Sequence, residues 1–261
     1  MTTIAITGAA RGIGAAIARE VAGRGHRVLL GDLDPSVEDL AASLGGVGGV
    51  LDVTSQASYE AWWGLVQHVD VLVNNAGVMW VGPYDEEPEA AARRQLEVNF
   101  LGVVRGTRLA IARRTQTVVT VASAASYISP PGEATYAASK HAVLGWMKAV
   151  RQEVTGVQLC LVLPTVVETE LAVGTSQGGV PRLAPEDVAR AVADVIARPR
   201  FETFVPARVG VLVRMLALLP QRGRDLAYKR LVPDQVRSAD RSARTGYEQV
   251  FGRRDGADSE D

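Results

Sequence analysis

Cysteine is almost absent, because the chain of 261 residues contains only one, Cys160. A single cysteine excludes an intramolecular disulfide. Its place in the apolar run 157–163 predicts a buried, inert thiol, which fits a reducing compartment. Histidine is scarce as well. His26, His68 and His141 are scattered without the spacing of metal ligands, so we expect no metal site and interpret His141 as structural.

Charge of one sign and long apolar stretches are also lacking. The net charge is −1 and the pI is about 6.3, so there is no basic surface of the kind that binds nucleic acid. No apolar stretch reaches the ~18–20 residues that cross a bilayer. A strand-like run starts at Thr2 and leaves no room for a signal peptide. We therefore expect a cytoplasmic protein without a nucleic-acid partner.

The first two thirds of the chain alternate short apolar runs with longer segments of helical periodicity. Ile13, Ile17 and Val21 recur every four residues, as they would on one face of a helix. The apolar runs are continuous, which is typical of parallel strands covered on both faces. They span 4–7, 27–31, 49–51, 69–73, 117–121 and 157–163. This pattern predicts an α/β fold, a doubly wound Rossmann-type parallel sheet with helices on both faces.

A glycine-rich turn joins the first predicted strand to the first predicted helix, with the sequence Thr-Gly-Ala-Ala-Arg-Gly-Ile-Gly over 7–14. Gly8 permits a tight turn, Gly12 lets a pyrophosphate approach the backbone, and Gly14 lets helix and strand pack closely. The helix N-terminus presents free N–H groups and the positive end of its dipole to an anion. A glycine-rich turn alone is a weak signal. Its position between strand and helix is what predicts a dinucleotide site.

Two side chains near this loop favour different dinucleotides. Asp32 ends the second strand, 18 residues after Gly14, where a carboxylate bonds the ribose hydroxyls of NAD and repels the 2′-phosphate of NADP. Arg11, in the loop, is a cation that attracts such a phosphate. We predict NAD rather than NADP, because Asp32 stands where the phosphate would lie and Arg11 can rotate away. The competing interpretation of Asp32 is a surface residue that starts the turn at 34–35.

Tyr136 and Lys140 are four residues apart, so on a helix they share a face. A tyrosine hydroxyl has a pKa of about 10, which makes it a poor base at neutral pH. A neighbouring ammonium group favours the phenolate and lowers that pKa. The pair is therefore a device for proton transfer to a ketone or from an alcohol. The competing interpretation is a solvated helix face, because this spacing is common.

Six features, in order along the chain, resemble the short-chain dehydrogenase/reductase family in its single-domain form. The resemblance covers about residues 2–200. Its features are the glycine loop 7–14, the pair Asp52-Val53, the segment Asn74-Asn75-Ala76-Gly77, then Asn99, Ser123, and Tyr136 with Lys140. It implies a dinucleotide-binding and catalytic unit over 1–200, with 201–261 as a C-terminal extension of the same domain.

The resemblance also implies a role for each catalytic residue. Tyr136 exchanges the proton with the substrate, Lys140 lowers the pKa of Tyr136 and bonds the nicotinamide ribose, Ser123 bonds the substrate oxygen, and Asn99 connects Lys140 to solvent through water. The implied cofactor contacts are Gly8, Arg11, Gly12, Ile13, Gly14, Asp32, Asp52, Val53, Asn75, Ala76, Gly77, Tyr136, Lys140, Val167 and Thr169.

Two positions bear on how well this pattern fits. Ser126 is a rival to Ser123, but its 10-residue distance from Tyr136 departs from the family's 13. Thr165 stands where the family has glycine, which puts the local backbone geometry after the sixth strand in question.

The segments that border the substrate pocket in the family are apolar in this chain. They contain Met79 and Trp80 after the Asn-Asn-Ala-Gly turn and Tyr127 after Ser123. With Ser123 these residues predict a bulky apolar alcohol or ketone, such as a steroid, a retinoid or a fatty chain. The competing interpretation is that some of them only fill the core.

Three functions compete on this fold. The leading one is an NAD-dependent alcohol dehydrogenase or ketone reductase, which the resemblance implies to be a homodimer or homotetramer. The second is a nucleotide-binding sensor or scaffold without catalysis, although such a protein need not keep Ser123, Tyr136 and Lys140 together. The third is dehydration or epimerisation, whose enzymes usually have longer substrate domains.

The C-terminal extension contains the run 209–219, which is apolar except for Arg214 and lies between further arginines. Three interpretations stay open: a lid or oligomer contact, a peripheral membrane contact through 207–224, or ordinary core. By composition, we expect 174–179 to be flexible and 252–261 to be disordered.

Overall fold

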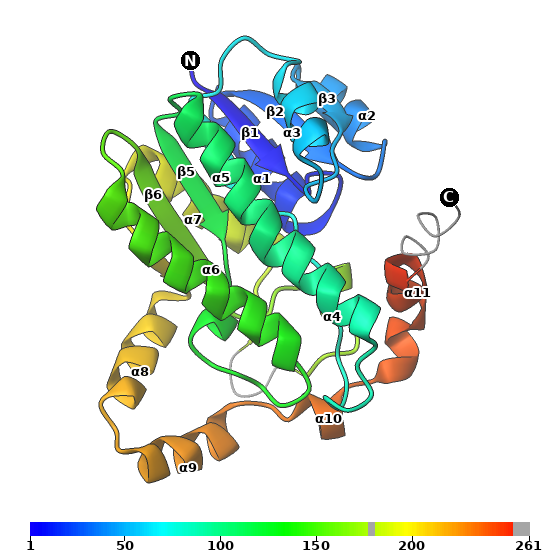
Figure 1. Ribbon diagram of the computed structural model, residues 1–261, viewed down its shortest axis with the longest axis vertical. Coiled ribbons are helices and arrows are strands. Elements are labelled where there is room, and N and C mark those ends of the chain that lie inside the picture. The colour runs from blue at the N-terminus through cyan, green and yellow to red at the C-terminus, as the bar shows by residue number, and fades with distance from the viewer. Residues whose placement is uncertain (177–180, 253–261) are drawn as a thin grey trace.

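A seven-stranded parallel sheet forms the centre of the protein in the computed structural model, which describes residues 1–176 and 181–252 (Figure 1). The strand order is β3-β2-β1-β4-β5-β6-β7. The strands are β1 Thr3–Thr7, β2 Arg27–Asp32, β3 Val47–Val50, β4 Val71–Asn74, β5 Thr117–Val121, β6 Gln158–Pro164 and β7 Glu202–Val205. The order runs outward in both directions from β1, so the predicted doubly wound Rossmann-type sheet is confirmed.

Helices cover both faces of this sheet, and each face has its own apolar core. One face carries α1 Gly12–Gly23, α2 Val37–Ser43 and α7 Pro185–Ala197. The other carries α3 Gln56–Trp63, α5 Gly102–Ala112, α6 Ala134–Glu153 and α8 Ala207–Ala217. Helix α4 (Glu89–Leu96) packs against α6 and continues into a π-helical turn, Glu97–Leu101, that leads into α5.

Alternation along β1 shows why the apolar runs of the sequence are continuous. Ile4 and Ile6 are fully buried in the core beside α1, whereas Ala5 between them is fully buried in the core beside α5 and α6. Successive side chains of a strand point to opposite faces, and here both faces are covered. Burying one such isoleucine stabilises the fold by roughly 1.5–3 kcal/mol. Cys160 of β6 is buried in the core beside α1, as predicted.

The chain beyond residue 200 first completes the sheet and then runs along its carboxyl end. Strand β7 pairs with β6, so the extension expected from residue 201 begins with part of the sheet. Helices α8 and α9 (Gln221–Leu231) form an arm at the lower left of Figure 1, and α10 (Gln235–Ser238) leads to α11 (Arg241–Gly252). None of the helices in the described ranges is long and apolar enough to span a bilayer.

Part of the segment expected to be flexible is held in place by this C-terminal chain. The carbonyl oxygen of Gly174 accepts a hydrogen bond of 2.7 Å from the Asp240 N–H, and the Ser176 N–H donates to Gln235 Oε1 over 2.7 Å. The rest of that segment, 177–179, lies outside the described residues, and so does most of the tail expected to be disordered, 253–261.

Candidate active site

The carboxyl ends of the strands open into a cleft of about 390 Å³. In open α/β sheets this edge is where ligands bind. Six loops contribute to the cleft, and they come from segments far apart in the sequence. Their lining residues are Gly8 and Arg11–Ile13 after β1, Asp32 at the end of β2, Leu51–Val53 after β3, Asn75–Met79 after β4, and Ala122–Ala125 after β5. The segments Pro164–Val167 and Thr169–Ala172, after β6, line its other side.

The glycine loop packs so closely that side chains are excluded at two positions. A Cβ atom on Gly8, which has φ +66°, would lie 2.7 Å from the Ala76 Cα. A Cβ on Gly14 would lie 2.0 Å from the carbonyl oxygen of Gly8. The loop therefore needs glycine at both positions. Gly14 allows the close packing that was predicted for it, and it is not among the described residues that line the cleft.

Thr7 and Asn75 bind the glycine loop to the loop after β4. The Asn75 side-chain amide donates to the carbonyl oxygens of Thr7, at 3.0 Å, and Gly8, at 2.9 Å. In return, the Thr7 hydroxyl accepts from the N–H groups of Asn75, at 3.0 Å, and Ala76, at 3.1 Å. Asn75 and Ala76 thus shape the loop as well as lining the cleft.

Asp32 and Arg11 are held in different directions. The Asp32 carboxylate accepts from the N–H groups of Ala10 and Asp34, both at 3.0 Å, which fixes it at one end of the cleft. Arg11 forms an ion pair of 2.8 Å with Glu170, in the loop after β6. Both partners of this pair are exposed, so it contributes little to stability. It orients the Arg11 guanidinium toward the rim of the cleft opposite the glycine loop.

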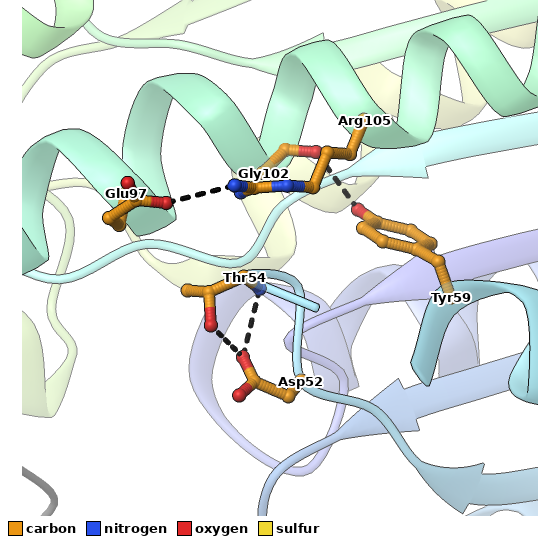
Figure 2. A network of polar contacts seen from close by, with 6 residues as sticks. All are labelled: Asp52, Thr54, Tyr59, Glu97, Gly102 and Arg105. Carbon is orange, nitrogen blue, oxygen red and sulfur yellow. Dashed lines mark hydrogen bonds and ion pairs between the residues drawn. The ribbon is translucent and has the colours of Figure 1, made fainter. Parts of the chain in front are cut away.

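Asp52 and Val53 form the cleft wall after β3, and a polar network supports them (Figure 2). Asp52 Oδ1 accepts from both the N–H and the hydroxyl of Thr54, at 2.8 Å each. Nearby, the Tyr59 hydroxyl donates to the carbonyl oxygen of Gly102 over 3.2 Å. A Cβ on Gly102 would lie 3.1 Å from a Val53 methyl carbon, so the start of α5 packs directly on Val53.

Tyr136 and Lys140 of α6 meet Ser123 in the cleft. The hydroxyl groups of Ser123 and Tyr136 are hydrogen-bonded, and Ser123 Oγ also accepts from the Ala125 N–H over 3.1 Å. Lys140 Nζ lies 5.6 Å from the centre of the Tyr136 ring and 3.4 Å from the Val121 carbonyl oxygen. Ser126, the rival to Ser123, is fully buried away from the cleft.

The charges around Tyr136 differ from the expected arrangement. Burial raises the pKa of Tyr136, the carboxyl group of Glu133 raises it further, and the hydrogen bond from Ser123 lowers it. Burial also lowers the pKa of Lys140 to about 8, so the ammonium charge expected to favour the phenolate is itself disfavoured. The hydrogen bond from Ser123 is the contact that lowers the pKa of Tyr136, and the effect of Lys140 on that pKa stays a prediction.

Asn99 lies in the π-helical turn, a form often found at functional sites. Its Oδ1 accepts from the Val78 N–H over 2.8 Å, and its Nδ2 donates to the Val78 carbonyl oxygen and Ser139 Oγ, at 2.9 and 3.1 Å. A Cβ on Gly77 would lie 3.3 Å from Asn99 Oδ1 and 3.8 Å from Lys140 Nζ. The Asn99 side chain thus fixes the loop after β4 beside Lys140. Its role toward a water molecule stays a prediction.

The structure divides the predicted substrate residues. Met79 and Ser123 line the cleft, whereas Trp80 and Tyr127 are not among its described lining residues. The Trp80 ring packs over Gly82. The Tyr127 hydroxyl donates to Glu202 Oε1 over 2.8 Å and accepts from Lys148 Nζ over 3.1 Å. Its hydroxyl is thus bound to Glu202 and Lys148 rather than directed into the cleft. The structure therefore places these two aromatic residues outside the described lining of the cleft.

Three residues of the site have no motif in the sequence. Glu133 lines the cleft one turn before Tyr136, and burial raises its pKa to about 7. Tyr247 of α11 also lines the cleft, and its hydroxyl accepts from the Met79 N–H over 3.1 Å. Arg244 is fully buried beneath it. The spacing of Glu133 from Tyr136 could have drawn attention to it, but only the fold brings α11 to this edge.

Arg244 joins the loop after β4 to the loop after β6 at one end of the cleft. Its guanidinium donates to the carbonyl oxygens of Met79, Leu171 and Val173, at 2.8, 3.0 and 2.8 Å. Apolar side chains of α8, of the end of α9 and of the chain after it also line the cleft. They are Val209, Leu212, Leu216, Leu231, Val232 and Pro233. These contacts favour the lid interpretation for part of the C-terminal extension.

The comparisons with known proteins agree with this geometry. The model of the short chain dehydrogenase family matches residues 2–178. Human estradiol 17-beta-dehydrogenase 11 is 29% identical over 238 residues, which cover 84% of this chain and 79% of the human protein.

Two solved structures share the fold. A short chain dehydrogenase/reductase from Burkholderia phymatum in complex with NAD superposes with a TM-score of 0.73 and 26% identity, covering 89% of this chain and 96% of that one. The alcohol dehydrogenase of Thermococcus sibiricus complexed with 5-hydroxy-NADP gives 0.69 and 28%, covering 78% and 95%. The family match spans more than half of the chain and includes the glycine loop, Ser123, Tyr136 and Lys140. The chain therefore belongs to the short-chain dehydrogenase family of oxidoreductases.

Proposed function

We propose that the protein is an NAD-dependent oxidoreductase that interconverts a bulky apolar secondary alcohol and its ketone, or a primary alcohol and its aldehyde. One observation carries the proposal. The hydrogen-bonded pair Ser123 and Tyr136 and the buried Lys140 face the same cleft as the glycine loop and Asp32. A dinucleotide along that cleft would bring its nicotinamide ring to the pair.

The residues present fit such a cofactor. The close approach at Gly8 and Gly14 leaves a bare backbone at the start of α1, where N–H groups and the helix dipole favour a pyrophosphate. Asp32 would bond the ribose hydroxyls, and Arg11 forms an ion pair with Glu170. This arrangement supports NAD over NADP. The remaining contacts would come from Ile13, Asp52, Val53, Asn75, Ala76, Gly77, Val167 and Thr169.

The bound cofactor would supply the hydride acceptor or donor, and the side chains would transfer the proton. Tyr136 would take the proton from the alcohol oxygen or return it to the ketone oxygen. Ser123 would donate a hydrogen bond to the same oxygen as negative charge develops there. Lys140 would bond the ribose and carry positive charge below its pKa of about 8.

The substrate end of the cleft supports a bulky apolar substrate. Met79, Leu171, Leu212, Leu216 and Leu231 contribute side chains to it. The human relative named as an estradiol dehydrogenase supports the same class, because a steroid alcohol is bulky and apolar. The family resemblance further supports a homodimer or homotetramer.

A screen of apolar alcohols with NAD, followed by the absorbance of NADH, tests the proposal. Tyr136→Phe should lower kcat/KM by roughly 10²–10⁴ because the proton transfer is lost. NAD binding, measured by quenching of protein fluorescence, should stay near wild type. The matched control is Tyr84→Phe at an exposed position. Normal turnover by Tyr136→Phe would refute the mechanism. NAD binding without turnover of any alcohol would favour a nucleotide sensor.

A further inference from the structure

A row of large apolar side chains faces solvent on α8 and continues onto α9. Val211, Met215 and Leu218 are spaced by four and three residues, so they share one helix face. Their exposed fractions are 58%, 63% and 86%. The opposite face of α8 is already buried, with Val209, Val213 and Leu216 at 5–6%. The outward row therefore does not belong to the core, and contiguous exposed apolar patches mark interaction sites.

Positive charge surrounds this row. Residues 207–231 contain six lysines and arginines and one acidic residue, a net charge of +5 in a chain whose total is −1. On α9, Arg222, Leu226 and Lys229 share one face, and the helix has no buried residue. The exposed basic residues are Arg208, Arg214, Arg222, Lys229 and Arg230. We call these five and the apolar Val211, Met215, Leu218 and Leu226 the α8–α9 surface.

Two candidate occupants fit this surface unequally. A second copy of the chain, docked by two-fold symmetry, would place one net charge of +5 against another, and these charges would repel. A lipid surface with anionic headgroups offers an apolar layer and negative charge together. With 11 residues each, α8 and α9 are too short to cross a bilayer, but an amphipathic helix can lie in its interface.

We propose that the α8–α9 surface docks the protein on an anionic lipid surface, with its apolar side chains in the interface and its basic residues at the headgroups. Leu212 and Leu216 of α8, and Leu231 of α9, line the cleft, so docking would bring the mouth of the cleft to the bilayer. An apolar alcohol dissolved in the membrane could then enter the site. This last step rests on the proposed function, whereas the docking itself does not.

Cosedimentation of the full chain with vesicles, without cofactor or substrate, tests the docking. We expect binding to phosphatidylcholine mixed with phosphatidylserine, little binding to phosphatidylcholine alone, and release at high salt. Met215→Gln/Leu218→Gln and Arg222→Gln/Lys229→Gln/Arg230→Gln should each weaken binding about 10-fold or more. Neither variant alters a residue that lines the cleft.

Matched controls change the same chemistry elsewhere. Arg19→Gln/Arg113→Gln/Arg198→Gln removes three exposed charges, and Val50→Gln/Leu65→Gln removes two exposed apolar side chains outside α8 and α9. Both should bind as wild type does.

Three results would overturn the proposal. The first is that the control variants lose as much vesicle binding as the α8–α9 variants. The second is that the wild type binds neither kind of vesicle. The third is that the wild type does not bind vesicles and Met215→Gln/Leu218→Gln changes the oligomeric state measured by light scattering. The last result would identify a contact between copies. If circular dichroism shows that a variant does not fold, the dependence of wild-type vesicle binding on lipid charge and on salt still tests the proposal. A failure here leaves NADH formation in solution intact, so it is distinguishable from failure of the proposed function.

Discussion

At the scale of the residue, Asp32 and Arg11 set the choice of dinucleotide. Asp32→Asn removes the charge but keeps an oxygen for one of the two backbone N–H groups that hold the carboxylate. We expect the ratio of kcat/KM for NAD to that for NADP to fall about 10- to 100-fold, because hydrogen bonds to a charged group are each worth about 1.5–3 kcal/mol. Asp39→Asn, at an exposed position on α2, should keep the wild-type ratio. An unchanged ratio for Asp32→Asn would remove this residue from cofactor selection.

Glu133 gives the site a pH dependence that can be measured. Its buried carboxyl has a pKa of about 7 and raises the pKa of Tyr136 when it is ionised. Glu133→Gln removes that charge, so the phenolate becomes easier to form. The pH profile of kcat/KM for alcohol oxidation should therefore shift to lower pH, by roughly one unit. Glu153→Gln, exposed at the end of the same helix, should leave the profile in place. A shift in the opposite direction would mean that Glu133 does not act on Tyr136 by its charge.

The same residue affects stability with a definite sign. Its folded pKa of about 7 lies above the ordinary 4.5, so between these values the folded protein binds more protons than the unfolded chain. The contribution of Glu133 to the free energy of unfolding is thus greatest below pH 4.5 and is lost as the pH rises toward 7. Glu133→Gln has no carboxyl group to ionise, so it does not lose stability in this way as the pH rises. Its free energy of unfolding relative to wild type should therefore be higher at pH 8 than at pH 4.5.

At the scale of the element, α11 holds the substrate end of the cleft through Arg244. Arg244→Gln leaves carbonyl oxygens of Met79, Leu171 and Val173 without their charged donor. We expect KM for the alcohol to rise about 10- to 100-fold, while KM for NAD stays within a few-fold, because each lost bond to a charged group costs about 1.5–3 kcal/mol. Arg241→Gln, on the same helix but paired with exposed Glu86, should change neither constant. Equal rises in both constants would indicate general unfolding rather than loss of a positioning residue.

The elements that could be predicted from the sequence are those with a strong local signal. β5 has the predicted bounds 117–121, because polar residues precede its β-branched run and both its faces are buried. The strand Glu202–Val205 has no such run, since only Phe204 is buried, and the sequence does not predict it. Trp80 and Tyr127 were placed in the substrate pocket by their neighbours in sequence, but the direction of a side chain depends on distant partners such as Glu202. The contacts of Arg244 cross more than 70 residues, and no local pattern predicts them.

At the scale of the whole molecule, the cleft joins six loops that come from the first 172 residues, so a cofactor bound there should stabilise the fold as a unit. At a concentration 100 times its Kd, NAD should add about 2.7 kcal/mol to the free energy of unfolding. For a chain of this size that corresponds to a rise in Tm of about 5–10 °C. Asp32→Asn should show a smaller rise at the same concentration, because its Kd is higher. Met215→Gln/Leu218→Gln should show the full rise, because the outward face of α8 lies outside the cleft. Differential scanning fluorimetry measures all three proteins. An NAD concentration series without any rise in Tm would show that the cleft does not bind the cofactor, whatever the alcohol screen finds.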